Sequence, residues 1–343
     1  MPVRPFGRAA GMVLAAVAAL ALTACSSDDP SPAPGEPGPT TLNVGYISGA
    51  SLAPAFVAEA LGCHAQQGLT VNFQLISNPA DAIALLSTGK IDAYVGSPSA
   101  AMFNQVQRGA NLKLVASLGS VNVPGDEPAP SGLFGAKHIA TVQDLRGKRV
   151  AVLGSVGTAT SYLLGKSLEA GGLTFADVQL VSLAVGDMVA ALANGGVEGA
   201  MLIAPYTQQA IDSGAGHALV DSKKAYGTST TSAIMFGPRL LEQYRDSGQK
   251  YLAAVACAAA KMQGDWRKDA SIITPLAAFL KVPETSLSGG GLYAFDPKMV
   301  VNAETMTDMQ KMFLAVPGTL TYTDIIPADK LVDDAIRVAA VGA

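Results

Sequence analysis

Short apolar runs alternate with amphipathic segments along most of the chain. Each run is typical of a strand, and the segment that follows it has the helical spacing of apolar positions. Asn78-Pro79 and Ser97-Pro98 have the form of a helix N-cap followed by proline at the first helical position. We expect strands at 42–47, 70–76, 91–96, 149–154, 178–183 and 197–203, and helices at 54–61, 79–88, 159–170 and 187–194.

This alternation predicts an α/β fold with open sheets flanked by helices, because parallel strands need crossovers long enough for a helix. The pattern occurs twice: a shift of 106 residues aligns Val44 with Val150, Asp81 with Asp187 and Gly89 with Gly195. The chain is therefore predicted to form two lobes of like topology. A ligand would bind in the cleft between them, at the carboxyl ends of the strands.

The N-terminal segment is typical of an export signal. Arg4 and Arg8 precede an uncharged apolar stretch, 11–24, which is too short to span a bilayer as a helix. The stretch ends in Leu22-Thr23-Ala24-Cys25, which resembles the lipobox of bacterial lipoproteins. We expect cleavage after residue 24, lipidation of Cys25 and membrane anchoring through that lipid. An ordinary signal peptide with a chance cysteine is the alternative.

Residues 25–41 are expected to form a tether between this lipidated cysteine and the globular part. The segment 26–40 is rich in Pro, Ser, Gly and acidic residues and has nothing that would form a core. Such a tether would let the domain stand off the membrane. No later stretch has the length and apolar character of a transmembrane helix.

Charge and residue content argue against several other functions. The formal net charge of −4 over 343 residues gives no basic surface field for nucleic acid. His64, His138 and His217 are far apart in sequence and form no zinc-binding spacing, so no metal or cofactor is expected. There is no Gly-x-Ser-x-Gly motif, and the glycine-rich stretch 154–157 lacks the lysine of a phosphate-binding loop.

Two cysteines remain after Cys25. Outside the cytoplasm, Cys63 and Cys257 would be able to oxidise to a disulfide that joins the first helix to a C-terminal one. Two free thiols buried in alanine-rich helices are the other interpretation. The sequence leaves both open.

A set of motifs extends over nearly all of the expected globular part. They are 53–55 (APA), 68–71 (GLTV), 87–93 (STGKIDA), 109–116 (GANLKLVA), 144–152 (DLRGKRVAV), 191–200 (ALANGGVEGA), 204–205 (AP) and the closing segments 306–320 and 327–336. In this order they resemble the nitrate/sulfonate/taurine-type periplasmic-binding family. Cys63 and Glu198-Gly199 depart from the family's usual residues, at positions away from the expected cleft.

The resemblance implies a two-lobed periplasmic-binding-protein type II fold, each lobe an open mixed sheet flanked by helices. The first lobe would be discontinuous, 42–135 plus 229–343, and the second would be 136–228. Segments 132–135 and 232–236 would cross between the lobes as a hinge, whose closure traps the solute.

Hydroxyl side chains gather at the turns that would face the cleft. The N-termini of the helices there would favour an anion, with hydroxyls as additional donors. Asp187 would accept from a ligand amine or act within its own helix turn, and Tyr206 follows Ala204-Pro205, where the resemblance places a ligand-facing turn. The predicted ligand-binding residues are Ser48, Ser51, Ser97, Ser99, Ser120, Thr158, Ser161, Asp187 and Tyr206; for each serine, plain helix capping is the alternative role. Tyr46 and Tyr94 are expected in the core.

By this resemblance the protein would be a monomeric solute-binding lipoprotein of an ABC importer, without enzymatic activity, with ABC permease subunits as partners. Its solute would be a small anion or zwitterion similar to a sulfonate, nitrate or taurine. A thiamine pyrimidine precursor is the alternative ligand. A biosynthetic enzyme on the same fold and a sensor lipoprotein without transport are the alternative functions.

Overall fold

The computed structural model describes residues 38–76, 78–123, 129–289 and 291–343. These residues belong to one compact unit. The predicted signal peptide, Cys25 and most of the predicted tether lie outside the described residues, so those expectations stay predictions. Within the described part, no helix is both long enough and apolar enough to cross a membrane.

The first sheet has the strand order β2-β1-β3-β10-β4. Strand β1 pairs in parallel with β2 and β3, whereas β10 is antiparallel to β3 and β4. The strands are β1 (Thr41–Tyr46), β2 (Thr70–Leu75), β3 (Ala93–Gly96), β4 (Lys113–Ser117) and β10 (Ala233–Phe236). Strands β3 and β10 are buried along their whole length, as expected for inner strands covered on both faces.

The second sheet repeats this plan in the order β7-β6-β8-β5-β9. Strand β6 is parallel to β7 and β8, and β5 is antiparallel to β8 and β9. The strands are β5 (Ser131–Ala136), β6 (Arg149–Val152), β7 (Gln179–Ser182), β8 (Gly199–Ile203) and β9 (Gly216–Ala218). The predicted α/β fold with two mixed sheets flanked by helices is confirmed.

Strand β5 corrects the expected hinge and lobe boundary. Gly132 pairs with Leu202 and Gly135 with Gly199, so residues 132–135 are strand residues of the second sheet. Residues 233–236 are likewise not a crossing segment, because they form β10 in the first sheet. The connections between the sheets precede these two strands in the chain. A short apolar run beside a crossing point looks the same in sequence whether it crosses or pairs, which explains the error.

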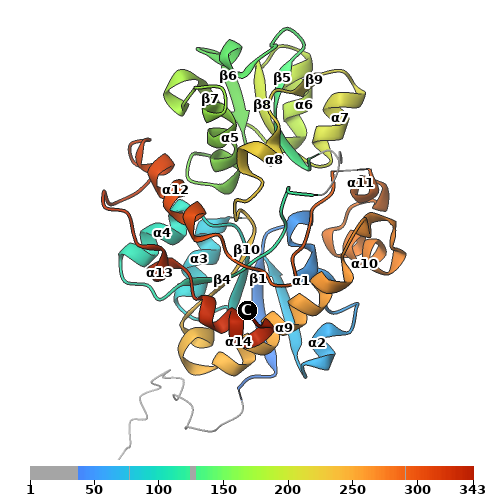
Figure 1. Ribbon diagram of the computed structural model, residues 1–343, viewed down its shortest axis with the longest axis vertical. Coiled ribbons are helices and arrows are strands. Elements are labelled where there is room, and N and C mark those ends of the chain that lie inside the picture. Colours follow the sequence, from blue (N-terminus) through green and yellow to red (C-terminus); the bar gives the residue numbers. More distant parts are fainter. Residues whose placement is uncertain (1–37, 77, 124–128, 290) are drawn as a thin grey trace, which may run out of the picture. The chain divides into compact units, whose positions relative to one another are not determined.

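Helices cover the faces of both sheets (Figure 1). Around the first sheet are α1 (Ala53–Val57), α2 (Cys63–Gln66), α3 (Pro79–Ser87), α4 (Ala100–Gln107), α9 (Arg245–Lys261), α10 (Ala270–Leu280), α11 (Glu284–Ser288), α12 (Ala303–Leu314), α13 (Ala328–Leu331) and α14 (Asp334–Val341). Around the second are α5 (Ala159–Glu169), α6 (Val185–Ala193), α7 (Tyr206–Asp212) and α8 (Ser222–Tyr226). The predicted N-cap Asn78 accepts a hydrogen bond from the Ala80 amide at 3.0 Å, and Pro79 begins α3.

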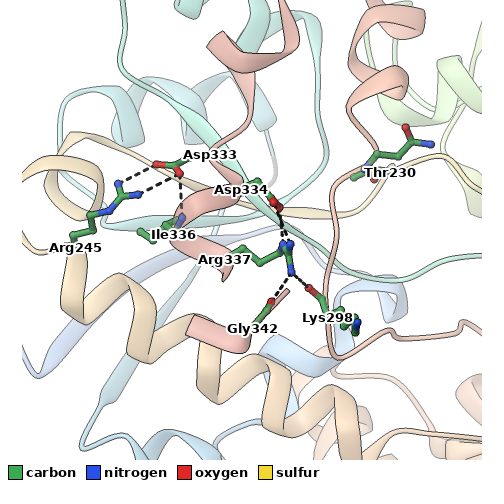
Figure 2. A network of polar contacts seen from close by, with 9 residues as sticks. Thr230, Arg245, Lys298, Asp333, Asp334, Ile336, Arg337 and Gly342 are labelled. Carbon is green, nitrogen blue, oxygen red and sulfur yellow. Dashed lines mark hydrogen bonds and ion pairs between the residues drawn. The ribbon is translucent and has the colours of Figure 1, made fainter. Parts of the chain in front are cut away.

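Two arginines hold the C-terminal helix α14 against the first lobe. Arg245 of α9 donates to both carboxylate oxygens of Asp333, at 3.0 and 3.2 Å, and Asp333 also caps α14 through the Ile336 amide (Figure 2). The nearly buried Arg337 donates to both oxygens of Asp334 and to the carbonyl of Lys298. Bidentate pairs of this kind fix geometry as well as add stability, so the end of the chain is locked to α9 and to the segment before α12.

A disulfide joins the helices α2 and α9. The sulfurs of Cys63 and Cys257 are bonded at 2.12 Å, which selects the disulfide over the two free thiols. The bond closes a loop of 194 residues that contains the whole second sheet. The disulfide therefore links the N-terminal part of the first lobe to α9, which belongs to the C-terminal part of the same lobe.

Replacing Cys63 and Cys257 by serine, in a Cys25→Ser background, should lower the free energy of unfolding by about 2–4 kcal/mol. The cross-link restricts the unfolded chain, and long loops gain most from it. Urea unfolding followed by circular dichroism measures the change. Two thiols that react with a labelling reagent in the unfolded, unreduced parent would contradict the assignment.

His64, next to the disulfide, is a fully buried histidine. Its Nδ1 lies 3.1 Å from Glu59 Oε2, its ring stacks on Tyr251, and its Nε2 has no hydrogen-bond partner in the part of the chain described. Burial lowers the pKa of His64 below its ordinary 6.5, although Glu59 opposes this. The folded protein thus keeps His64 neutral at a pH where the unfolded chain takes up a proton.

The free energy of unfolding should therefore be constant with respect to His64 above pH 6.5 and decrease below it, by up to about 1.4 kcal/mol per pH unit for one proton. Urea unfolding between pH 7.5 and 5.5 measures this slope. His64→Gln should reduce it, whereas the exposed His138→Gln serves as the control and should not. An equal slope in all three proteins would refute the assignment.

Candidate functional site

The predicted ligand-binding residues lie at the carboxyl ends of the parallel strands. Ser48 and Ser51 follow β1, Ser97 and Ser99 follow β3, and Ser120 follows β4. In the second sheet, Thr158 and Ser161 follow β6, Asp187 follows β7, and Tyr206 follows β8. The expected placement at strand ends is therefore observed in both sheets; the ligand-binding role of these residues stays a prediction.

Internal hydrogen bonds occupy five of these nine side chains. Ser51 accepts from Ser232 at 2.8 Å, and Ser120 donates to the Gly227 carbonyl at 2.9 Å. Ser99, Thr158 and Ser161 cap helices. Ser120, Thr158 and Ser161 also donate in their bonds, so capping and positioning describe them better than ligand contact. Ser51 and Ser99 only accept, and their hydroxyl hydrogens bond no described residue.

The other four side chains make no hydrogen bond to any residue that the structure describes. They are Ser48, Ser97, Asp187 and Tyr206. Ser48 and Asp187 are exposed, and Ser97 and Tyr206 are half-buried. These four remain as candidates for contact with a ligand.

Ser99 corrects the predicted start of the helix after β3. The sequence predicts Ser97 as the N-cap, but Ser99 caps the helix: its hydroxyl accepts from the Met102 amide, and α4 begins at Ala100. In Ser-Pro-Ser both serines have a capping side chain, so local sequence does not decide between them. The shift leaves the Ser97 hydroxyl outside the cap, at the strand end.

The backbone amides at the start of α5 donate hydrogen bonds to side chains of the same turn. The Ser161 hydroxyl is fully buried, accepts from the amides of Gly157 and Thr158 at 3.1 and 3.0 Å, and donates to the Thr158 carbonyl. Thr158 Oγ1 in turn accepts from the Ser161 amide at 3.2 Å. These N–H groups are therefore engaged within the turn, and this helix start has few donors for an anion.

The loop before α5 contacts the start of α4 in the other lobe. The Ala100 amide donates to the Gly157 carbonyl at 2.9 Å. A Cβ on Gly157 would lie 2.8 Å from Ala100 Cβ, and Gly157 has φ of 104°, so the position favours glycine on both counts. The strand-end loops of the two sheets thus meet beside Ser97.

A second contact between the lobes is formed by Tyr162 of α5. Its hydroxyl donates to Asp308 of α12 at 3.0 Å and lies 3.2 Å from Ser229, and burial raises its pKa to about 12. Lys166 of α5 also pairs with Asp308, at 3.0 Å. These residues line an open cavity of about 520 Å³ together with Lys311. One carboxylate therefore holds two side chains of the opposite lobe.

Two exposed leucines at strand ends were not predicted. Leu75 ends β2 with 55% of its surface exposed, and Leu153 follows β6 with 40% exposed. Large aliphatic side chains at these positions offer apolar surface at the ends of β2 and β6. The sequence marks Leu153 as the last apolar residue before its turn, but it does not mark Leu75, because the apolar Ile76 follows it.

The strand-end turns that hold the nine predicted residues contain no lysine or arginine among the described residues. Nor do the described residues contain a group of three or more His, Cys, Asp or Glu side chains able to hold a metal ion. The polar groups available at the strand ends are hydroxyls, the Ala101 amide in the first turn of α4, the first amides of α6, and the carboxylate of Asp187. The Ala100 and Met102 amides of α4 already bond Gly157 and Ser99. They suit a small polar solute bound by hydrogen bonds.

Thr158→Ala should lower the free energy of unfolding by about 1 kcal/mol, because it removes the cap of α5. Ser97→Ala should change it by less than about 0.5 kcal/mol, since its hydroxyl bonds no described residue. Urea unfolding without ligand measures both, and Thr158→Ser, which keeps the hydroxyl, is the control. Equal effects of the two alanine variants would contradict this division of roles.

Comparisons with known proteins agree with this architecture. The model of the NMT1-like family matches residues 35–274. The riboflavin-binding protein RibY of Chloroflexus aurantiacus is 29% identical over 176 residues, which cover 46% of this chain and 47% of RibY. The alignment thus spans about half the length of this curated relative.

Among solved structures, the periplasmic aliphatic sulphonate binding protein SsuA of Escherichia coli is similar with a TM-score of 0.67 at 22% identity, covering 86% of this chain and 92% of that one. The periplasmic nitrate-binding protein NrtA of Synechocystis PCC 6803 gives 0.65 at 16% identity, covering 88% of both chains. The desulfurization enzyme DSZB gives 0.58 at 15% identity, covering 87% and 98%. At these identities the likeness shows the fold.

Proposed function

The chain belongs to the NMT1-like family, and from this premise we propose that it is the extracytoplasmic solute-binding component of an ABC importer. The observation that carries the proposal is the contact between strand-end loops of two similar sheets, Ala100 with Gly157, with polar side chains unbonded to described residues at strand ends of both. Binding proteins for a sulphonate and for nitrate share the fold. Open α/β sheets bind ligands at this edge.

The proposed solute is a small anion or zwitterion of the sulfonate, nitrate or taurine type. In the absence of a cation in these turns, an anionic group would be held by helix N-termini and by hydroxyls such as Ser97. Asp187, exposed in the first turn of α6, would pair with an amine of a zwitterion. The apolar surface of Leu75 and Leu153 favours a solute with a short carbon chain over a bare inorganic anion.

Capture would proceed by closure of the two lobes over the solute. Contacts that join the lobes, such as Ala100 with Gly157 and Tyr162 with Asp308, would hold the closed form. The permease subunits of the importer would recognise that form, because closure fixes the relative positions of surfaces on both lobes. We further propose that the protein is monomeric and anchored to the membrane by lipid on Cys25, on the basis of the N-terminal sequence.

An enzymatic role is the competing function, because DSZB has the same fold. The described cysteines argue for binding instead of thiol chemistry at the strand ends: Cys63 and Cys257 are joined to each other, between α2 and α9. A riboflavin ligand, suggested by the similarity to RibY, is a competing solute. Both are distinguished by direct tests of binding and turnover.

Taurine and ethanesulfonate differ only by an amine, so they separate the role of Asp187 from that of the anion site. We expect both to raise the Tm of the Cys25→Ser protein, because a ligand specific to the folded state stabilises it. Asp187→Asn should weaken taurine binding about tenfold, as loss of a charged hydrogen bond does, and leave ethanesulfonate binding unchanged. Calorimetric titration measures the two affinities.

Asp212→Asn, at the far end of α7 in the same lobe, is the matched control and should affect neither ligand. Nitrate and riboflavin complete the panel. A Tm raised by riboflavin alone would overturn the proposed solute class, and consumption of a ligand during the titration would favour the enzymatic role. No shift with any of the four would reject the proposed function in its present form.

A further inference from the structure

Tyr94 contains a buried hydroxyl without a partner. The side chain is fully buried, and its Oη forms no hydrogen bond with any residue of the described chain. Burying a hydroxyl unpaired costs free energy, which a phenylalanine at the same position would avoid. Tyr251 on α9 has the same property, and what sets Tyr94 apart is its place on an inner strand of the first sheet.

The hydroxyl lies at the carboxyl end of β3. Tyr94 and Gly96 point to the same face of the sheet, and the ring extends along the strand over Gly96. A Cβ on Gly96 would lie 2.4 Å from the Tyr94 Cζ and 2.6 Å from its Oη. The absence of a side chain at Gly96 thus makes room for the phenol at the last residue of the strand.

Other polar groups of the candidate site follow this position in the chain. Ser97, whose hydroxyl is unbonded to described residues, directly follows Gly96, and α4 begins three residues later. The Ala100 amide in its first turn meets the Gly157 carbonyl of the second lobe. The phenol, the Ser97 hydroxyl and the N-terminus of α4 therefore occupy one end of one strand, where the lobes meet.

The phenol at this place is a hydrogen-bond donor. Burial raises the pKa of Tyr94 well above the ordinary value of 10, so the hydroxyl keeps its proton at neutral pH. The positive end of α4 favours an electron-rich atom in the same region. An oxyanion oxygen satisfies both groups.

We propose that Tyr94 is a solute-binding residue whose hydroxyl donates to an anionic oxygen, of a sulfonate or carboxylate, held at the N-terminus of α4. This inference rests on the proposed function and names the first-lobe group that recognises the anion. The unpaired hydroxyl lowers the stability of the ligand-free protein and is paired in the complex. A binding residue that stabilises nothing in the free protein is typical of a functional site.

Tyr94→Phe separates this role from a structural one because the two predict opposite results. The variant should unfold in urea at the same or a higher concentration than the parent, since no internal hydrogen bond is lost. It should bind ethanesulfonate about tenfold or more weakly by calorimetric titration, the loss expected for one hydrogen bond to a charged group. Taurine should show the same loss, because both probes carry the sulfonate.

Tyr251→Phe is the matched control. Tyr251 is also fully buried with an unpaired hydroxyl, but it lies on α9, where it packs against His64. This variant should have a similar stability effect and unchanged affinity for ethanesulfonate. Loss of affinity in both variants would point to a general effect of buried hydroxyls and overturn the assignment.

Two further results would overturn the inference alone. One is unchanged ethanesulfonate affinity in Tyr94→Phe, and the other is a marked loss of its stability without ligand, which would mean that the hydroxyl is paired inside the fold. Failure of the proposed function differs from both: neither sulfonate probe would bind the parent, and the inference would fall with it.

Discussion

The parallel pairing of β1 with β3 and of β6 with β8 is the constraint on which the site depends. Parallel strands end at one edge of a sheet. The turns that follow β1, β3, β6 and β8 therefore lie at these edges although they are far apart in sequence. Two sheets with the same strand order present two such edges. The hydroxyls, Asp187 and Tyr206 reach this region because of the backbone ladders beneath them, and their own side-chain bonds determine only which of them are available.

Hydrogen-bond satisfaction separates the candidate ligand-binding side chains from the scaffold only together with their place in the fold, because Tyr251 and His64 also contain unpaired buried atoms away from the strand ends. Thr158 and Ser161 resemble ligand-binding residues by position, yet they satisfy each other and the start of α5. Ser97 and the phenol of Tyr94 have the opposite property, since neither is paired among the described residues. In a binding protein, polar groups of the scaffold are hydrogen-bonded to one another, whereas groups that bind a ligand are unpaired until the ligand is present.

The alternation of strands and helices predicted the fold class and the parallel strands from sequence, with ends that differ by one or two residues. Strands β4, β5, β9 and β10 were missed. Strands β5 and β10 follow a crossing between the sheets, β4 and β9 lie at the sheet edges, and a pattern of apolar positions carries no information about the partner strand. The nine predicted residues do follow strand ends, and their ligand-binding role stays a prediction. Their separation into caps and free groups depends on distances such as that between Ser99 and Met102, and the position of the Tyr94 ring over Gly96 depends on tertiary packing.

The unequal origin of the two sheets also has a consequence for the order in which they are completed. All strands of the second sheet come from the contiguous stretch 131–218, whereas the first sheet needs β10 from 233–236 in addition to strands that end at residue 117. Because the chain is synthesised from its N-terminus, all strands of the second sheet are present before β10, the strand that the first sheet still lacks. The Cys63 thiol, made early, has to wait for Cys257, made after both sheets. The disulfide of the first lobe thus forms only after the second sheet has been synthesised, although synthesis of the first lobe starts earlier.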